Sequence, residues 1–218
     1  MDLTLNPAVL PEIDLYCERE TNDWLDEPLG LLSNSAFLAA AWHSARPNFK
    51  NHSPAVQWLI GVLAAIGIGS ALFHATATRW ALLMDVIPIQ LFILSALWIL
   101  LRAQLQCRTG PAVIVMTGFL AVSSLVPSHV LNGSASYLPA WLALLLITLL
   151  SPPGLARSWL IRATVLFPVS LTFRTLDLPA CTLVPVGTHF LWHLCNALVL
   201  WMIIEAVKAR PGPSHGKN

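Results

Sequence analysis

Seven runs of mostly apolar residues, each close to the length of a membrane-spanning helix, follow one another along this 218-residue chain. A spanning helix needs about 20 apolar residues, because the hydrocarbon core is about 30 Å thick and each helical residue rises about 1.5 Å. The joining segments are short and carry the helix breakers Pro, Gly and Asn. The expected spans are residues 28–45, 55–75, 80–101, 111–127, 137–151, 158–174 and 185–205. The sequence therefore predicts an all-α, polytopic membrane protein, a bundle of seven transmembrane helices.

Composition supports this fold class and excludes one class of partner. The chain is 56% hydrophobic and 11% charged, whereas an ordinary soluble domain carries about 25% charged residues. Its formal net charge is only +1. Binding to nucleic acid requires a basic patch or stripe, and the sequence has none. No nucleic acid partner is expected.

The distribution of Lys and Arg predicts the orientation, because loops rich in these residues stay on the cytoplasmic side. With seven spans, nine of the 12 basic residues fall on one side: Arg46, Lys50, Arg102, Arg108, Arg157, Arg162, Lys208, Arg210 and Lys217. The N-terminus is thus expected outside the cytoplasm and the C-terminus inside it, with no cleavable signal peptide. The expected organisation is an acidic arm (residues 1–27), a membrane domain (28–207) and a disordered cytoplasmic tail (208–218).

The N-terminal arm holds most of the acidic residues of the chain. Eight of the 11 lie within the first 27 residues: Asp2, Glu12, Asp14, Glu18, Glu20, Asp23, Asp26 and Glu27. Two interpretations are open. The arm is either a solvated acidic segment or, since clustered carboxylates beside Asn22 suit a hard cation, a calcium site.

Four ionisable residues are expected at membrane depth, where a charge is costly and so indicates function. His74 ends the second span, Asp85 lies near the start of the third, and His189 and His193 begin the seventh at a spacing of four. That spacing places both imidazoles on one helix face, and Ser70 and His74 share it. If the three spans are neighbours, these side chains converge just beneath the outer surface. Arg162, by contrast, can extend to the headgroups.

Three neutral imidazoles suit zinc, and three protein ligands leave a fourth tetrahedral position open, as in catalytic sites. The first hypothesis is an intramembrane zinc enzyme whose metal activates a water molecule. The alternative is a receptor or sensor with a structural zinc site, for which Cys195 would be the candidate fourth ligand. A third, a proton or ion carrier, would need ionisable groups at several depths, whereas these lie at one.

The four cysteines allow one disulfide. Cys17 and Cys181 both fall in segments expected outside the cytoplasm, where an oxidising compartment would allow them to pair. Cys107 and Cys195 are expected as free thiols. The simpler alternative, four unpaired cysteines, stays open at this point.

Several of these residues recur together in a known family. Cys17-Glu18 with Glu27, Ser33-Asn34, Gly69-Ser70 followed by Phe73-His74, Asp85, and the segment from His189 to Trp192-His193 resemble the alkaline ceramidases. These are seven-span zinc hydrolases related to the adiponectin receptors. The matching blocks extend from the arm to the last span.

The resemblance implies a role for each matching residue. His74, His189 and His193 would bind zinc, Asp85 would handle the proton of the attacking water, and Ser70 would help to stabilise the oxyanion. The substrate would be ceramide or another N-acyl lipid, cleaved to an amine and a fatty acid. Glu18 and Glu27, with Asp14 and Asn22 as weaker candidates, would hold calcium, and Cys17 and Cys181 would form the family's disulfide. The compact loops look more like bacterial relatives, so a bacterial inner membrane is expected, with endoplasmic reticulum or Golgi as the alternative.

Overall fold

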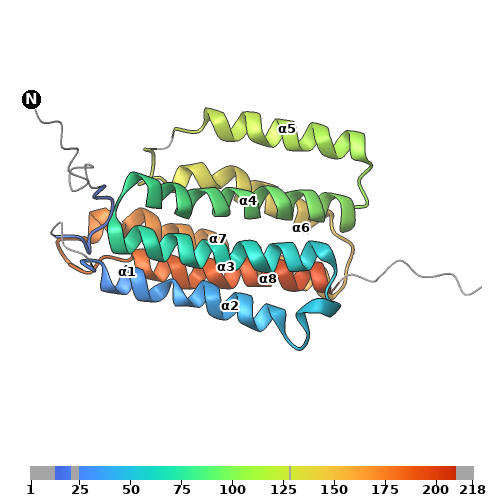
Figure 1. Ribbon diagram of the computed structural model, residues 1–218. Helices are drawn as coiled ribbons and strands as arrows, with labels where there is room; N and C mark the ends of the chain where they lie inside the picture. The colour runs from blue at the N-terminus through green and yellow to red at the C-terminus, as the bar shows by residue number, and fades with distance from the viewer. Residues whose placement is uncertain (1–12, 21–24, 128, 210–218) are drawn as a thin grey trace, which may run out of the picture.

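All the regular structure of the described chain is helical. We analysed a computed structural model, which describes residues 13–20, 25–127 and 129–209. The eight α-helices are α1 (Pro28–Ser33), α2 (Ser35–Ala45), α3 (Pro54–Thr76), α4 (Arg79–Ala103), α5 (Thr109–Leu125), α6 (Leu138–Leu150), α7 (Leu155–Ala180) and α8 (His189–Lys208). Two short 3-10 helices, η1 (Phe49–Asn51) and η2 (Ser134–Tyr137), lie in the connections. The longer helices run roughly side by side as a bundle (Figure 1), which confirms the all-α prediction.

Three helices of the described chain, α3, α4 and α8, are long and apolar enough to cross a membrane. The apolar helix α5 and the segment Ser134–Leu150 are shorter, and α7 is long but carries four charged residues. Large apolar side chains also face outward on most helices, including Trp58, Ile68, Leu83, Ile114, Leu146, Val165 and Leu198. Exposed apolar surface of this extent is typical of contact with lipid. These features fit a membrane protein, whereas the seven-span topology and its orientation stay predictions.

Two of the expected spans differ from the helices observed. The first is divided at Asn34, because the side chains of Ser33 and Asn34 both donate to the Gly30 carbonyl oxygen (both 2.8 Å). The backbone N–H of Asn34 then bonds to Leu31 instead, and such local side-chain hydrogen bonds compete with the regular helix. The sixth expected span stops at residue 174, but α7 continues to Ala180. This extension carries Asp177 into the protein interior, where it is 1% exposed.

Helix α8 lies inside the bundle and α5 at its edge. Helix α8 contacts α2, α3, α4 and α7, and the pairs α3–α4 and α7–α8 pack most extensively. Helix α5 buries only Ala112 and runs apart from the other helices (Figure 1). The described part of the arm packs at one end of the bundle, beside the start of α8 and the end of α3. The candidate site is at this end.

Candidate metal centre

His74, His189 and His193 form a compact group at the arm end of the bundle. They come from the last turn of α3 and the first two turns of α8. Each offers a ring nitrogen within 4.8 Å of the other two, and their exposed fractions are 1%, 5% and 2%. Three buried imidazoles at this spacing could hold a metal ion. The convergence predicted from the sequence is therefore present in the structure.

The second ring nitrogens orient two of these histidines. His74 Nδ1 contacts the Glu27 carboxylate, and His193 Nδ1 lies 2.7 Å from Ser33 Oγ. Metal-binding histidines usually make such a contact, which fixes the ring and its tautomer. Ser33 Oγ can donate its proton to the Gly30 carbonyl and accept from His193 Nδ1–H. His74 Nδ1–H donates to Glu27, so both Nε2 atoms are then free to bind a metal.

The distance between these Nε2 atoms agrees with a shared metal ion. They lie 3.2 Å apart. Two nitrogen ligands of a tetrahedral zinc ion lie about 3.3 Å apart, because each zinc–nitrogen bond is about 2.0–2.1 Å. The third histidine, His189, has a buried Nδ1 without a hydrogen-bond partner in the described chain.

Arg19 of the arm reaches the same group through Glu27. Its Nε donates to Glu27 Oε1 (2.5 Å), and its Nη2 donates to the backbone carbonyl of His74 (3.2 Å). Both side chains are almost fully buried. Burial raises the pKa of Glu27 above the usual value for a glutamate, while the Arg19 guanidinium acts in the opposite direction. The carboxylate thus connects a buried cation to a candidate metal ligand.

The Asp177 carboxylate links the arm to the start of α8 by hydrogen bonds. Its Oδ1 accepts from the backbone N–H groups of Thr188 (2.6 Å) and His189 (2.8 Å), and its Oδ2 accepts from Cys17 (3.0 Å). Carboxylates are favourable at helix N-termini, where backbone N–H groups lack partners. A disulfide joins Cys17 to Cys181 beside it, so the predicted pairing is present. Cys107 and Cys195 are free thiols.

Tyr16, between Asp14 and the disulfide, covers the histidines. Its ring stacks on His189 with centroids 3.6 Å apart and lies 5.2 Å from His74. It is 5% exposed, and burial raises the pKa of Tyr16 to about 12. The phenol therefore stays neutral near neutral pH.

Ser70 and Asp85 share a polar pocket with His189 and His193. The pocket has a volume of ≈ 50 Å³. The Ser70 hydroxyl is hydrogen-bonded to the Asp85 carboxylate, whose Oδ1 is buried without a partner in the described chain. Asp85 itself is 8% exposed. A buried carboxylate oxygen directed at such a pocket can accept a proton there.

Glycine and proline bring these two side chains together. A Cβ atom on Gly69 would lie 1.9 Å from the Met84 carbonyl oxygen, so only glycine allows α3 and α4 to approach this closely. Pro88 lacks the N–H that would otherwise bond to Met84 four residues earlier. The Met84 carbonyl, to which Pro88 cannot donate, thus faces α3 at Gly69, the residue preceding Ser70.

A second pocket adjoins the polar one and lies among apolar side chains. It also has a volume of ≈ 50 Å³. Ile89, Tyr137 and Asn196 border both pockets. The remaining lining is almost entirely apolar and includes Phe92, Leu97, Phe119, Leu144, Phe167 and Leu200. The polar groups therefore lie next to an apolar cavity between the helices.

The acidic residues predicted to bind calcium have other contacts in the structure. Glu18 accepts from the backbone N–H groups of Leu29 (2.6 Å) and Gly30 (2.7 Å), and burial raises its pKa. The Glu27 carboxylate accepts a hydrogen bond from Arg19 and contacts the His74 ring. Asp14 is exposed, and Asn22 lies outside the described residues. The described contacts of both glutamates are thus with N–H groups, and calcium binding stays a prediction.

Comparison with known proteins gives no match: neither a protein-family model nor a curated protein matches this sequence. Membership of the alkaline ceramidase family stays a prediction based on the motifs quoted above. The grouping of the three histidines is independent of that resemblance.

Sequence reasoning missed four residues of this end of the bundle: Tyr16, Arg19, Arg174 and Asp177. Arg174 and Asp177 lie at or beyond the end expected for the sixth span, so they were not considered at membrane depth. A signal was nonetheless present, because Asp177 is the lone carboxylate of residues 155–180. Nothing in the sequence of the arm indicates that Arg19 pairs with Glu27.

Proposed function

We propose that this protein is an integral-membrane, zinc-dependent amide hydrolase that resembles the alkaline ceramidases. Its substrate would be ceramide or another N-acyl lipid, cleaved to an amine and a free fatty acid. One observation carries the proposal: two of the three histidines that could hold a metal ion, His189 and His193, border a pocket together with Asp85 and Ser70, and an apolar pocket adjoins it.

The donor set fits zinc. The three imidazoles are neutral nitrogen ligands, and the group found among the described residues contains no cysteine or carboxylate. Three protein ligands with an open position are typical of catalytic rather than structural zinc. Zinc bound there would act as a Lewis acid and lower the pKa of a water to about 7. Glu27 and Ser33 would hold two of the rings in the tautomer that binds metal.

Asp85 is the proposed general base. Its unpartnered Oδ1 would accept the proton of the attacking water and return it to the leaving amine, because amide cleavage needs that nitrogen protonated. Ser70 has a single hydroxyl proton, and the Asp85 carboxylate is an acceptor for it. Ser70 would therefore position Asp85 first, and could donate to the oxyanion once Asp85 carries a proton.

The two pockets match the two parts of an N-acyl lipid. The apolar cavity, at ≈ 50 Å³, would take the first carbons of the acyl chain, and the amide would lie in the polar pocket beside Asp85, His189 and His193. Ligand sites generally combine an apolar lining with a few convergent polar groups. The exposed apolar surface of the helices would let the substrate enter from the bilayer.

The receptor alternative requires a closed metal site with a fourth protein ligand. Cys195 was the sequence candidate, but it lies two residues beyond His193, is partly exposed and does not border the polar pocket. This arrangement favours the hydrolase.

The first test measures zinc content and fatty acid release together, on detergent-purified protein and a panel of N-acyl lipids. We expect one zinc per chain in the wild type and loss of zinc and cleavage in His193→Ala. Asp85→Asn should keep zinc but slow turnover by about 10²–10⁴-fold, the usual contribution of general acid–base catalysis. His43→Ala, in α2 and outside the polar pocket, is the matched control.

Two results would contradict the proposal. Zinc retained in the wild type without cleavage of any amide would favour the receptor. Full turnover in Asp85→Asn would exclude Asp85 as the base, even if the protein is an amidase.

A further inference from the structure

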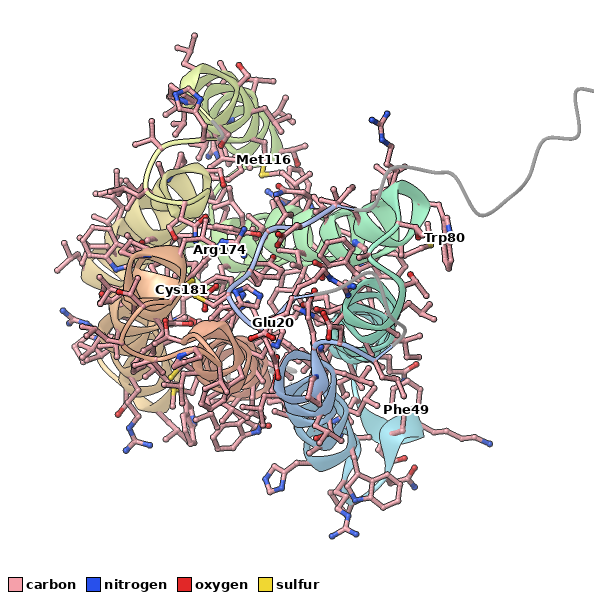
Figure 2. All side chains as sticks on the ribbon, turned by 90° about the vertical axis from the view of Figure 1, so that its left-hand side faces the viewer. Glu20, Phe49, Trp80, Met116, Arg174 and Cys181 are labelled. Carbon is pink, nitrogen blue, oxygen red and sulfur yellow. A yellow bond between two sulfur atoms is a disulfide. The ribbon has the colours of Figure 1, made fainter. Side chains whose placement is uncertain are left out.

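Arg174 borders the polar pocket together with Asp85, His189 and His193. It lies in α7, one turn before Asp177. In Figure 2, which views the arm end of the bundle, Arg174 lies within the group of helices, whereas Trp80 and Phe49 lie toward the outside. None of the roles proposed above uses this arginine. A partly buried cation beside a candidate metal site therefore needs its own explanation.

The contacts of Arg174 stabilise its charge but leave most of its donors available. Its guanidinium carbon lies 5.7–5.8 Å from the ring centroids of Tyr16, Tyr137 and Trp192. Cation–π contacts of this kind favour the cation through the ring faces. Within the described chain, the guanidinium donates one hydrogen bond, from Nη1 to the Tyr16 hydroxyl (3.2 Å), and its Nε is buried without a partner. A guanidinium has five N–H donors in a planar fork.

Arg174 also differs from Arg19, the buried arginine of this end. Arg19 forms an ion pair with Glu27, whereas the ion pairs found in the described chain do not include Arg174. Asp85 is the carboxylate that interacts with it electrostatically across the pocket, and Asp85 is hydrogen-bonded to Ser70. A planar guanidinium with free N–H donors is suited to a carboxylate or phosphate.

The position of Arg174 indicates which part of the substrate it would contact. It borders the polar pocket but not the apolar one. Its nearest arm residue, Tyr16, also borders only the polar pocket. If the acyl chain fills the apolar cavity, Arg174 faces the amine part of the lipid on the other side of the amide.

We propose that Arg174 binds an anionic group on the amine part of the substrate. The preferred substrate is then an N-acyl lipid whose amine carries a carboxylate or a phosphate, not a neutral amino alcohol. This inference rests on the proposed amidase function for its catalytic readout, but the anion site itself can be tested by binding alone.

The test uses two lipids of nearly equal shape, N-oleoylglycine and N-oleoylethanolamine, which differ in a carboxylate against a neutral hydroxymethyl group. For each we would measure kcat/KM and the rise in melting temperature of the purified protein. We expect the wild type to prefer N-oleoylglycine by about 10- to 100-fold, the usual effect of one buried charge-assisted hydrogen bond. We also expect N-oleoylglycine to stabilise the protein more.

Three variants assign this preference to Arg174. Arg174→Gln should lose the preference for N-oleoylglycine, because kcat/KM falls for this anionic lipid only. Arg174→Lys should restore part of the preference. Arg162→Gln is the matched control, because Arg162 lies on the same helix, exposed beside Trp159 and outside the pocket. Zinc-depleted wild type shows whether the carboxylate binds the metal instead.

Each outcome decides the inference. Equal or stronger use of the neutral lipid by the wild type overturns it, as does a preference that persists in Arg174→Gln. An equal fall in kcat/KM for both lipids in Arg174→Gln would show that the arginine has only a structural role. If neither these two amides nor any other N-acyl lipid of the panel is cleaved, the amidase proposal fails. A larger rise in melting temperature with N-oleoylglycine that disappears in Arg174→Gln would then still support the anion site. If the wild type shows no such rise, the anion site is overturned.

Discussion

Glu27 is the residue that connects the arm to the metal centre, since its carboxylate binds both Arg19 and His74. We predict that Glu27→Gln lowers zinc affinity by about 10- to 100-fold, the usual effect of removing such a partner from a ligating histidine. The amide is uncharged and so holds the His74 tautomer less firmly. Competition with a zinc-selective chelator measures the effect.

Glu205→Gln is the control for Glu27→Gln. Glu205 forms an ion pair with Lys208 at the far end of α8, with about 20% of its side chain exposed. The Glu205→Gln substitution should leave zinc affinity unchanged. Unaltered zinc affinity in Glu27→Gln would show that Glu27 serves the fold of the arm and not the metal centre.

At the residue scale, helical spacing predicted that His189 and His193 share one face of α8, since they lie four residues apart. That His74 meets them was predicted only on the condition that its helix is a neighbour of α8, and the structure meets this condition. The partners of these rings could not be predicted in the same way. Glu27 and Arg19 approach His74 from an arm without helical periodicity, and their contacts depend on how that arm folds back over the bundle.

At the scale of helices, the contact between α3 and α4 determines the distance between Ser70 and Asp85. We predict that Gly69→Ala destabilises the protein by about 1–3 kcal/mol, as overpacking usually does, and reduces amidase activity. The added methyl group would collide with the Met84 carbonyl, so the helices must move apart. Thermal unfolding and turnover measure the two effects.

Gly61→Ala provides a matched control on the same helix, because a Cβ atom at Gly61 meets nothing within 4 Å. Here alanine should be neutral or stabilising by about 0.5–1 kcal/mol, since glycine is unfavourable within a helix. If Gly69→Ala behaves like Gly61→Ala, the close approach of α3 and α4 is not required.

The helices themselves were largely predictable from apolar runs and breakers, but their ends were not. Helix α7 contains Pro168 and Pro179, yet it continues to Ala180, six residues beyond the expected end at residue 174. Tertiary contacts compensate for one proline. The Thr164 carbonyl, which Pro168 leaves without its helical partner, accepts from the indole N–H of Trp141 (3.1 Å). Such a contact between α6 and α7 cannot be read from local sequence.

At the scale of the whole molecule, the two ends of the bundle differ in charge and chemistry. The arm end holds the disulfide and the histidine group, whereas Arg46, Lys50, Arg102, Arg108, Arg157 and Lys208 lie toward the opposite end. Basic loops remain in the cytoplasm and disulfides form outside it. Both features predict that the candidate metal centre lies on the extracytoplasmic side.

Single-cysteine labelling with a membrane-impermeant maleimide tests this orientation. The background would carry Cys107→Ser and Cys195→Ser, and would keep the disulfide. We predict that Val130→Cys, at an exposed position between α5 and α6, reacts in intact cells. Lys50→Cys, exposed in η1 at the opposite end, should react only after permeabilisation.

The two labelling sites also test the number of crossings. In the seven-span topology they lie in the first and fourth loops, separated by three crossings, and must therefore face opposite sides. The reverse pattern would put the disulfide in the reducing cytoplasm, and non-reducing electrophoresis should then show Cys17 and Cys181 unpaired. Reaction of both sites in intact cells would place both loops on one side. At least one of the intervening helices would then fail to cross, and the seven-span topology would be wrong.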